Sequence, residues 1–148
     1  MREQRIDIKI NGTKISTFYG TTIIDHVSYY STDMSIYNNT VANNVNFSVF
    51  DDTSGNHNRN QLNVNLSDDY VIAGEGSNIS IGQKQKILLM RTLNRDREVY
   101  IFDEPTGNLD VESTNKFLNE IGLLNDKIVI LVSHQSNLLN KCDVVYEE

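Results

Sequence analysis

The sequence predicts an α/β fold in which a parallel β-sheet is flanked by helices. Residues 99–102 (VYIF) and 127–133 (KIVILVS) are apolar runs of strand length, as expected for strands inside a parallel sheet. Between them, residues 112–124 carry apolar side chains at helical spacing, which predicts a helix that connects the two strands. Ahead of the sheet, residues 5–10 alternate between apolar and charged side chains before Asn11-Gly12, which predicts a short β-hairpin.

The remaining elements are shorter. In chain order they are a second hairpin strand at residues 13–17, an inner strand at 23–30, a loop and short helix at 31–45, a polar stretch at 46–65, a turn at 74–78, a helix at 82–93, a short helix at 136–140 and a last strand at 143–146. The polar stretch is rich in asparagine and shows no regular period, so we predict no more than a short helix there.

The helix at residues 82–93 is expected to begin at a capping box, because Ser80 is followed three residues later by Gln83. Its inner face would carry Ile87 and Met90, with Leu93 at its end. A helix N-terminus presents free N–H groups and a positive dipole end, which together can bind an anion. Ser80 adds a hydroxyl donor, and Gly82 allows a close backbone approach. The alternative is an ordinary helix cap without a ligand.

The composition narrows the classes of function. The chain of 148 residues has a net charge of −7 and a pI near 4.9, which argues against a nucleic-acid-binding surface. Cys142 is the single cysteine, so neither an internal disulfide nor a cysteine-rich metal site is expected. The charged residues 1–5 do not resemble a signal peptide. No run reaches the roughly 18 apolar residues of a membrane helix, so any action at a membrane would use a partner.

Two carboxylates, Asp103 and Glu104, follow the apolar strand at residues 99–102. They would lie at the carboxyl edge of the sheet, where open α/β sheets bind ligands. Phosphoryl-transfer sites need one acid that holds Mg²⁺ and a group that positions or deprotonates the attacking water. The alternative is that Asp-Glu-Pro ends a strand and caps the next helix.

The stretches ISIGQ-KQK and VYIFDEP-TGNLD resemble the nucleotide-binding domain of ABC transporters, most closely those of exporters. The first resembles the signature motif, and the second resembles the Walker B strand and D-loop. The resemblance implies a P-loop NTPase-like fold, ATPase activity, and ATP and Mg²⁺ as cofactors. It also implies a transmembrane exporter partner, a second nucleotide-binding domain as dimer partner, and a cytoplasmic place at the inner face of the membrane. No nucleic-acid partner is expected.

The resemblance also assigns roles to individual residues, by the motif positions that they occupy. These are Glu104 as catalytic base and His134 as the H-loop residue that contacts the γ-phosphate, Asp103 as metal ligand, and Ser80, Gly82, Gln83 and Asp110 as residues that bind or couple to ATP across the dimer. Two positions depart from the family pattern. Ile81 stands where the signature has glycine, and its β-branched side chain would disfavour a positive φ. Thr32 stands where the Q-loop has glutamine, and it has a shorter reach and no amide.

The phosphate-binding loop of this family, Walker A, has the pattern G-x-x-x-x-G-K-[S/T]. None of the eight glycines is followed by lysine, so the sequence holds no such loop. In the family this loop lies upstream of the hairpin, with its own strand and helix. The sheet is therefore expected to lack one interior strand.

We predict one partial ABC-type ATPase domain over residues 1–148. Residues 1–30 would form the hairpin and inner strand, 31–76 a Q-loop-like segment with a reduced helical subdomain, and 77–148 the signature, Walker B, D-loop and H-loop. Its ATPase activity would need a Walker A from another chain. The alternative is a non-catalytic half-domain that acts in trans, or an inactive product of a truncated gene.

Overall fold

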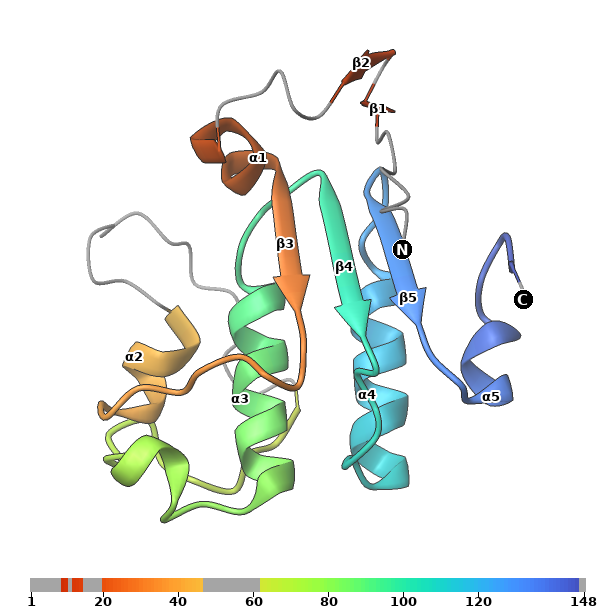
Figure 1. The fold of residues 1–148 in the computed structure, drawn as a ribbon. Coiled ribbons are helices and arrows are strands. Elements are labelled where there is room, and N and C mark those ends of the chain that lie inside the picture. Colours follow the sequence, from red (N-terminus) through yellow and green to blue (C-terminus); the bar gives the residue numbers. More distant parts are fainter. Residues whose placement is uncertain (1–8, 11, 15–19, 47–61, 147–148) are drawn as a thin grey trace, which may run out of the picture.

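A computed structural model describes residues 9–10, 12–14, 20–46 and 62–146. The elements are β1 (Lys9–Ile10), β2 (Thr13–Lys14), α1 (Gly20–His26), β3 (Val27–Tyr30), α2 (Val41–Asn46), the 3₁₀ turn η2 (Gly74–Gly76), α3 (Ile81–Leu93), β4 (Val99–Asp103), α4 (Val111–Gly122), β5 (Ile128–Val132) and α5 (Ser136–Leu139) (Figure 1). None of the helices in these ranges is long and apolar enough to cross a membrane. The described part of the hairpin, β1 paired antiparallel with β2, confirms that prediction.

The central sheet has the strand order β3-β4-β5, and both strand pairs are parallel (Figure 1). Tyr30 lies in register with Phe102, and Phe102 with Leu131. Because all three strands run the same way, their carboxyl ends lie at one edge of the sheet. The predicted α/β fold with a parallel sheet is therefore confirmed, and its carboxyl edge gathers the residues that follow each strand.

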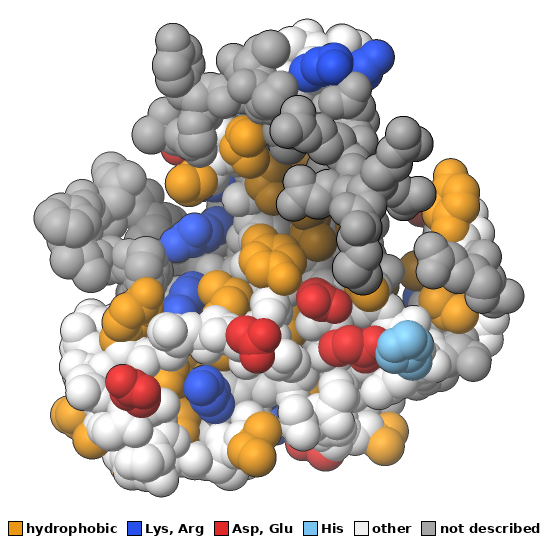
Figure 2. All heavy atoms as spheres, viewed as in Figure 1, with side chains coloured by type: hydrophobic (Ala, Val, Ile, Leu, Met, Phe, Trp, Pro, Cys, Tyr) orange, Lys and Arg blue, Asp and Glu red, His pale blue; other side chains and the backbone are white. Residues whose placement is uncertain are grey.

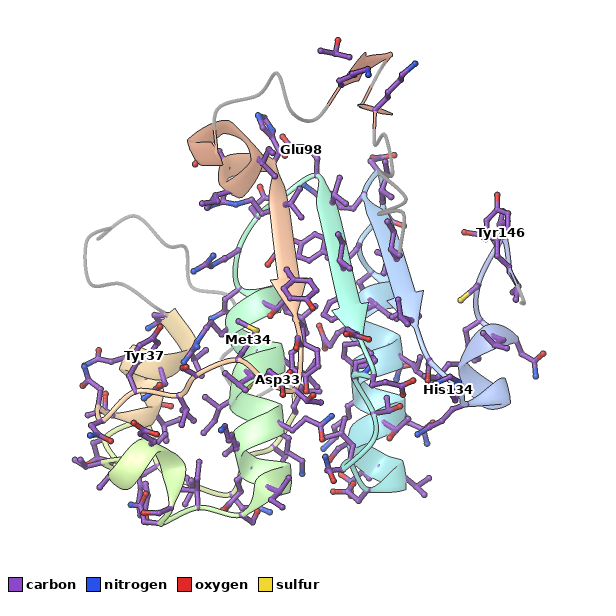
Figure 3. The ribbon with its side chains drawn as sticks, viewed as in Figure 1. Asp33, Met34, Tyr37, Glu98, His134 and Tyr146 are labelled. Atoms are coloured by element: carbon purple, nitrogen blue, oxygen red, sulfur yellow. The ribbon has the colours of Figure 1, made fainter. Side chains whose placement is uncertain are left out.

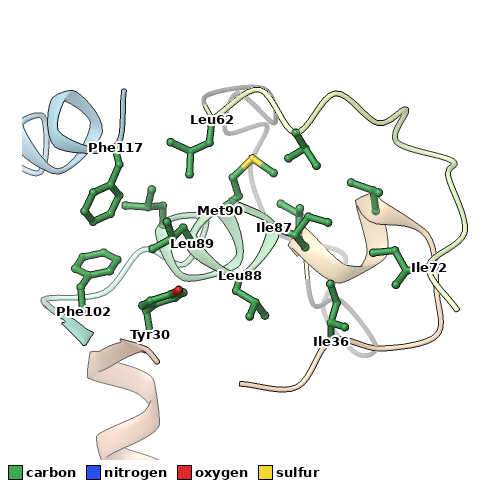
Figure 4. Close-up of a cluster of buried hydrophobic side chains, with 14 of the residues drawn as sticks. Tyr30, Ile36, Leu62, Ile72, Ile87, Leu88, Leu89, Met90, Phe102 and Phe117 are labelled. Atoms are coloured by element: carbon green, nitrogen blue, oxygen red, sulfur yellow. The ribbon is translucent and has the colours of Figure 1, made fainter. Parts of the chain in front are cut away.

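One face of the sheet is covered by α3 and α4. Tyr30, Tyr100 and Phe102 point into this side and are almost fully buried. Phe102 meets Phe117 of α4 edge-on, with the ring centroids 5.1 Å apart. Figure 4 shows these rings beside the apolar residues of α3, which form one cluster. The core therefore lies between the sheet and these two helices.

On the opposite face of the sheet, apolar side chains of the described strands are exposed. Side chains alternate along a strand, and on this face Ile128, Ile130 and Val132 of β5 are 61%, 45% and 50% exposed. Tyr29 of β3, in register with Ile101 of β4 on the same face, is also exposed. Figure 2 shows hydrophobic side chains in the middle of the surface turned to the viewer, with acidic side chains and a histidine below them. Parallel sheets are normally covered on both faces.

Helix α3 is the centre of the described structure. Its residues 85–93 are all buried, because the sheet lies on one side and α2 with residues 62–72 on the other. The predicted inner residues Ile87, Met90 and Leu93 are buried. The helix begins as predicted: the Ser80 hydroxyl accepts the Gln83 N–H at 3.1 Å, and the Gln83 side chain accepts the Ser80 N–H at 2.9 Å.

One predicted strand, at residues 23–30, is too long, and another, at residues 143–146, is wrong. Residues 23–26 belong to helix α1, and only Val27–Tyr30 is a strand. Its ladder with β4 begins at Val27–Val99, so within the described sheet the earlier residues have no strand to pair with. Residues 143–146 form no strand in the described structure, and Val144, Val145 and Tyr146 are exposed. Of the polar stretch 46–65, residues 47–61 lie outside the described residues.

Candidate functional site

The two predicted carboxylates leave β4 at the carboxyl edge of the sheet. Asp103 is the last residue of the strand and lies in register with Val132. Glu104 follows with φ = 47°, a left-handed conformation that is uncommon for a residue with a side chain. Its N–H donates to the Val132 carbonyl at 2.9 Å. This backbone bond holds the change of direction that sends Glu104 out of the strand.

The Glu104 carboxylate lies against the segment that follows β5. Its Oε1 accepts the His134 N–H at 3.1 Å, and its Oε2 accepts the Ser133 hydroxyl at 3.4 Å. The His134 Nε2 is 3.7 Å from Oε1, and this imidazole is fully exposed. Figure 3 places His134 and Asp33 at the carboxyl edge of the sheet, below the strands that precede them. The structure thus brings together Glu104 and His134, which follow two neighbouring strands.

The signature-like residues begin α3 close to the D-loop-like residues. Gly82 packs tightly there, since an added Cβ would lie 3.1 Å from the Asn108 carbonyl oxygen. Gly82 was predicted to allow a close approach of phosphate. In this structure the group that lies close to it is the backbone of Asn108, one of the D-loop-like residues. Ile81 begins the helix with its side chain 70% exposed. It is not among the residues with positive φ, so its β-branched side chain causes no backbone strain here.

A hollow connects these two motifs. It is lined by Val64, Asn65, Ser80, Gly82, Gln83, Lys86, Asn108 and Asp110. All four predicted ATP-binding residues are among these. The hollow is built by one chain and opens to solvent, so the residues are placed to contact a molecule that approaches from outside.

Asp110 is held rigidly at the rim of this hollow. It caps α4 by accepting the Ser113 N–H at 2.7 Å and the Ser113 hydroxyl at 2.9 Å. Lys86 Nζ donates to it at 3.1 Å. The bonds from Ser113 and then from Lys86 lower the pKa of Asp110 to about 2. Asp110 is therefore a carboxylate at neutral pH, and Lys86 places a positive charge beside it.

The Q-loop-like segment is fixed to α3 by a buried arginine. Arg91 donates from Nε to the Asn44 carbonyl at 2.7 Å and from Nη1 to the Ser35 carbonyl at 2.8 Å. Its guanidinium lies 5.1 Å from the centre of the Tyr37 ring. Thr32 and Asp33 precede this anchored part and are exposed at the end of β3. They lie at the same edge as Glu104, but none of their described contacts reaches it.

The sequence predicted no role for two residues that make contacts at this site. Gln85 and Lys86 are buried although polar; Gln85 bonds to Pro105 in the loop after Glu104, and Lys86 bonds to Asp110 at the start of α4. Their position was detectable, since Gln85 lies on the apolar face of the helix at the spacing of Leu88, Leu89 and Thr92. A polar side chain on that face needs a partner. The sequence does not show which partner it has.

Comparison with known proteins places this geometry in a family. The sequence model described as "ABC transporter" matches residues 2–107. The pediocin PA-1 transport/processing ATP-binding protein PedD of Pediococcus acidilactici is 28% identical over 97% of this chain and 21% of its own length. The ATP-dependent lipid A-core flippase of Vibrio cholerae is 26% identical over 93% of this chain and 26% of its own. The chain thus spans about a fifth to a quarter of these relatives.

A solved structure shows the same fold. A bacterial Atm1-family ABC exporter with ATP bound superposes with a TM-score of 0.74 at 19% identity, over 88% of this chain and 25% of the exporter. The family model covers more than half of the 148 residues. The chain therefore belongs to the ABC transporter family, and its parallel sheet and helices have the fold of an exporter nucleotide-binding domain.

Proposed function

We propose that this chain is the signature and Walker B part of an exporter nucleotide-binding domain that hydrolyses ATP. The observation that carries the proposal is the edge of the sheet, where Asp103, Glu104 and His134 come together beside the D-loop-like residues. Two carboxylates at the end of one strand can have separate roles, one as metal ligand and one as base, since adjacent side chains point in different directions. ATP would supply the phosphoryl group, and Mg²⁺ would neutralise charge on its phosphates.

Each residue has a specific part in this proposal. Asp103 would hold Mg²⁺ with its carboxylate. Mg²⁺ commonly takes one or two protein carboxylates and completes its shell with phosphate and water oxygens. Glu104 would accept a proton from the attacking water. His134, exposed and next to Glu104, would donate a hydrogen bond to the terminal phosphate.

The signature hollow would serve a second nucleotide-binding domain. Ser80, Gly82 and Gln83 lie at the first turn of α3, where N–H groups and the dipole favour an anion. They line an open hollow, so they would contact ATP held by the opposite domain. Asp110 at its rim would link the two sites across the dimer. A transmembrane exporter partner would place the assembly at the cytoplasmic side of the membrane.

The open sheet supports a further part of the proposal, that a segment outside these 148 residues supplies the phosphate-binding loop. Among the described strands, β5 pairs only with β4, and the apolar residues Ile128, Ile130 and Val132 are exposed beside this edge. A strand–loop–helix unit would pair with β5 and cover the open face. Its helix N-terminus would then lie at the carboxyl edge, near Asp103 and Glu104.

ATP turnover tests this function. The chain alone should show no measurable Mg-ATP hydrolysis, and turnover should appear once a polypeptide with the G-x-x-x-x-G-K-[S/T] unit is added. Glu104→Gln should abolish that turnover while the two chains still associate. Turnover by the chain alone that disappears in Glu104→Gln would overturn the need for a second segment.

One observation favours a non-catalytic alternative. The residues that line the signature hollow all belong to this chain. The chain could therefore present this surface to the ATP of an intact partner domain without hydrolysing ATP itself. This role predicts that the partner's turnover rises with this chain, is unaffected by Glu104→Gln, and falls with Ser80→Ala. The Glu104 variant therefore separates the two functions.

A further inference from the structure

Gln85 joins two separate parts of the structure, helix α3 and the loop after β4. It lies on α3 and is only 4% exposed, so its amide must find partners inside the protein. Its Nε2 donates to the Pro105 carbonyl at 2.8 Å, and its Oε1 accepts the Asn108 N–H at 3.0 Å. The side chain of Tyr30, at the end of β3, is a neighbour of the same amide. One amide therefore joins α3 to the loop that follows β4.

These two hydrogen bonds hold the first and last residues of the loop 105–108. This loop begins directly after Glu104, whose φ of 47° must be maintained by its surroundings. It ends at Asn108, which lines the signature hollow. On its other side, the buried Thr106 hydroxyl donates to Gln135 Oε1 at 3.1 Å. The loop is thus hydrogen-bonded to α3 on one side and to the segment that carries His134 on the other.

We propose that Gln85 is a positioning residue that keeps this loop docked on α3 and so couples the signature hollow to Glu104. A molecule that binds in the hollow and displaces the start of α3 would pull Asn108 and Pro105 with it. Because Pro105 directly follows Glu104 in the chain, a displacement of Pro105 changes the direction of the Glu104 carboxylate. The catalytic consequence rests on the proposed function, whereas the coupling between α3 and the loop does not.

Amide hydrogen exchange measures this coupling directly. Gln85→Met removes both hydrogen bonds at nearly constant volume. The protection of the Asn108 N–H should fall about tenfold more than that of the α3 amides, because a buried donor loses its acceptor. Thr92→Val is the matched control. Thr92 is also a buried polar residue of α3, but its hydroxyl bonds to the Leu88 carbonyl at 3.0 Å and the Tyr29 carbonyl at 3.5 Å. Neither carbonyl lies in the loop 105–108, so Asn108 should lose no more protection than the α3 amides do.

Gln85→Glu tests hydrogen bonding through the pH dependence of Asn108 protection, which a role in packing alone would not change. A protonated carboxyl can donate to the Pro105 carbonyl and accept from Asn108, as the amide does. An ionised carboxylate loses the donor and repels that carbonyl. Protection of Asn108 should therefore be close to wild type at low pH and fall as the carboxyl ionises. The titratable neighbour Tyr30 stays neutral over this range, since burial raises its pKa to about 12.

The outcomes decide between coupling and core packing. Equal losses at Asn108 and the α3 amides in Gln85→Met, or a pH-independent Gln85→Glu, would overturn the proposal. If Gln85→Met does not fold, Gln85→Glu at low pH carries the test. In the complex with a phosphate-loop polypeptide, Gln85→Met should lower kcat several-fold with KM for ATP unchanged. A wild-type complex without turnover would refute the proposed function, while the exchange data would still decide the role of Gln85.

Discussion

Replacing Arg91 with methionine should loosen the Q-loop-like segment from α3. Arg91 is 3% exposed and carries three hydrogen bonds to this segment. These go to the Asn44 carbonyl, the Ser35 carbonyl and, at 2.9 Å, the Asn44 side-chain oxygen. Methionine keeps most of the volume of the buried chain but donates none of these bonds. The variant therefore tests hydrogen bonding with little change in packing.

The expected loss can be worked out from these contacts. The Asn44 side-chain oxygen also accepts the Tyr37 N–H, so it keeps a donor. The carbonyl of the buried Asn44 loses the Arg91 donor, and a buried unsatisfied acceptor costs about 1–3 kcal/mol. The Ser35 carbonyl belongs to an exposed residue, where water can replace the lost donor. Loss of the cation–π contact with Tyr37 adds about 0.5–1 kcal/mol. Burial lowers the pKa of Arg91 to about 10, so methionine also removes the cost of a desolvated charge. The net loss should be about 2 kcal/mol of unfolding free energy.

Urea unfolding followed by far-UV circular dichroism measures this loss, because the chain has no Trp to follow by fluorescence. The midpoint should fall at constant m. Lys116→Met is the control for charge removal. Lys116 makes an exposed ion pair with Glu112 at 2.7 Å, worth about 0.5 kcal/mol or less. A loss in Arg91→Met no larger than in the control would refute the reasoning, as would wild-type stability of Arg91→Lys.

Three further predictions concern the same core and site. Gly82→Ala should lower the thermal midpoint and shift the Asn108 amide resonance, because the new Cβ lies 3.1 Å from a backbone oxygen; a raised midpoint would show that helix propensity wins. Asp110→Asn should destabilise the chain equally at all pH values above about 4, and the difference should vanish as pH falls through the folded-state pKa of about 2; a difference that persists at lower pH would exclude the carboxylate as its cause. Phe117→Ala should cost about 3–5 kcal/mol in urea unfolding, since its ring is fully buried against Phe102; a loss under about 1 kcal/mol would contradict the described core.

Local patterns in the sequence predicted the elements whose structure depends on local contacts. The Ser80–Gln83 capping box, helix α3, strands β4 and β5 and the described part of the hairpin all agree with the prediction. The motifs also identified the family correctly. Residues 23–26 and 143–146 were misjudged because β-branched and apolar residues favour a strand only where another strand pairs with them. That condition depends on the rest of the sheet.

The sequence by itself determined which residue types stand at the candidate site and in which local element each lies. Only the tertiary structure decided their contacts. It placed Glu104 against His134, Asp110 against Lys86 and Gln85 against the loop after β4, and it left one face of the sheet open. The physical reason is that these bonds join residues far apart in the chain. Their partners are set by strand register and helix packing, which no local pattern encodes.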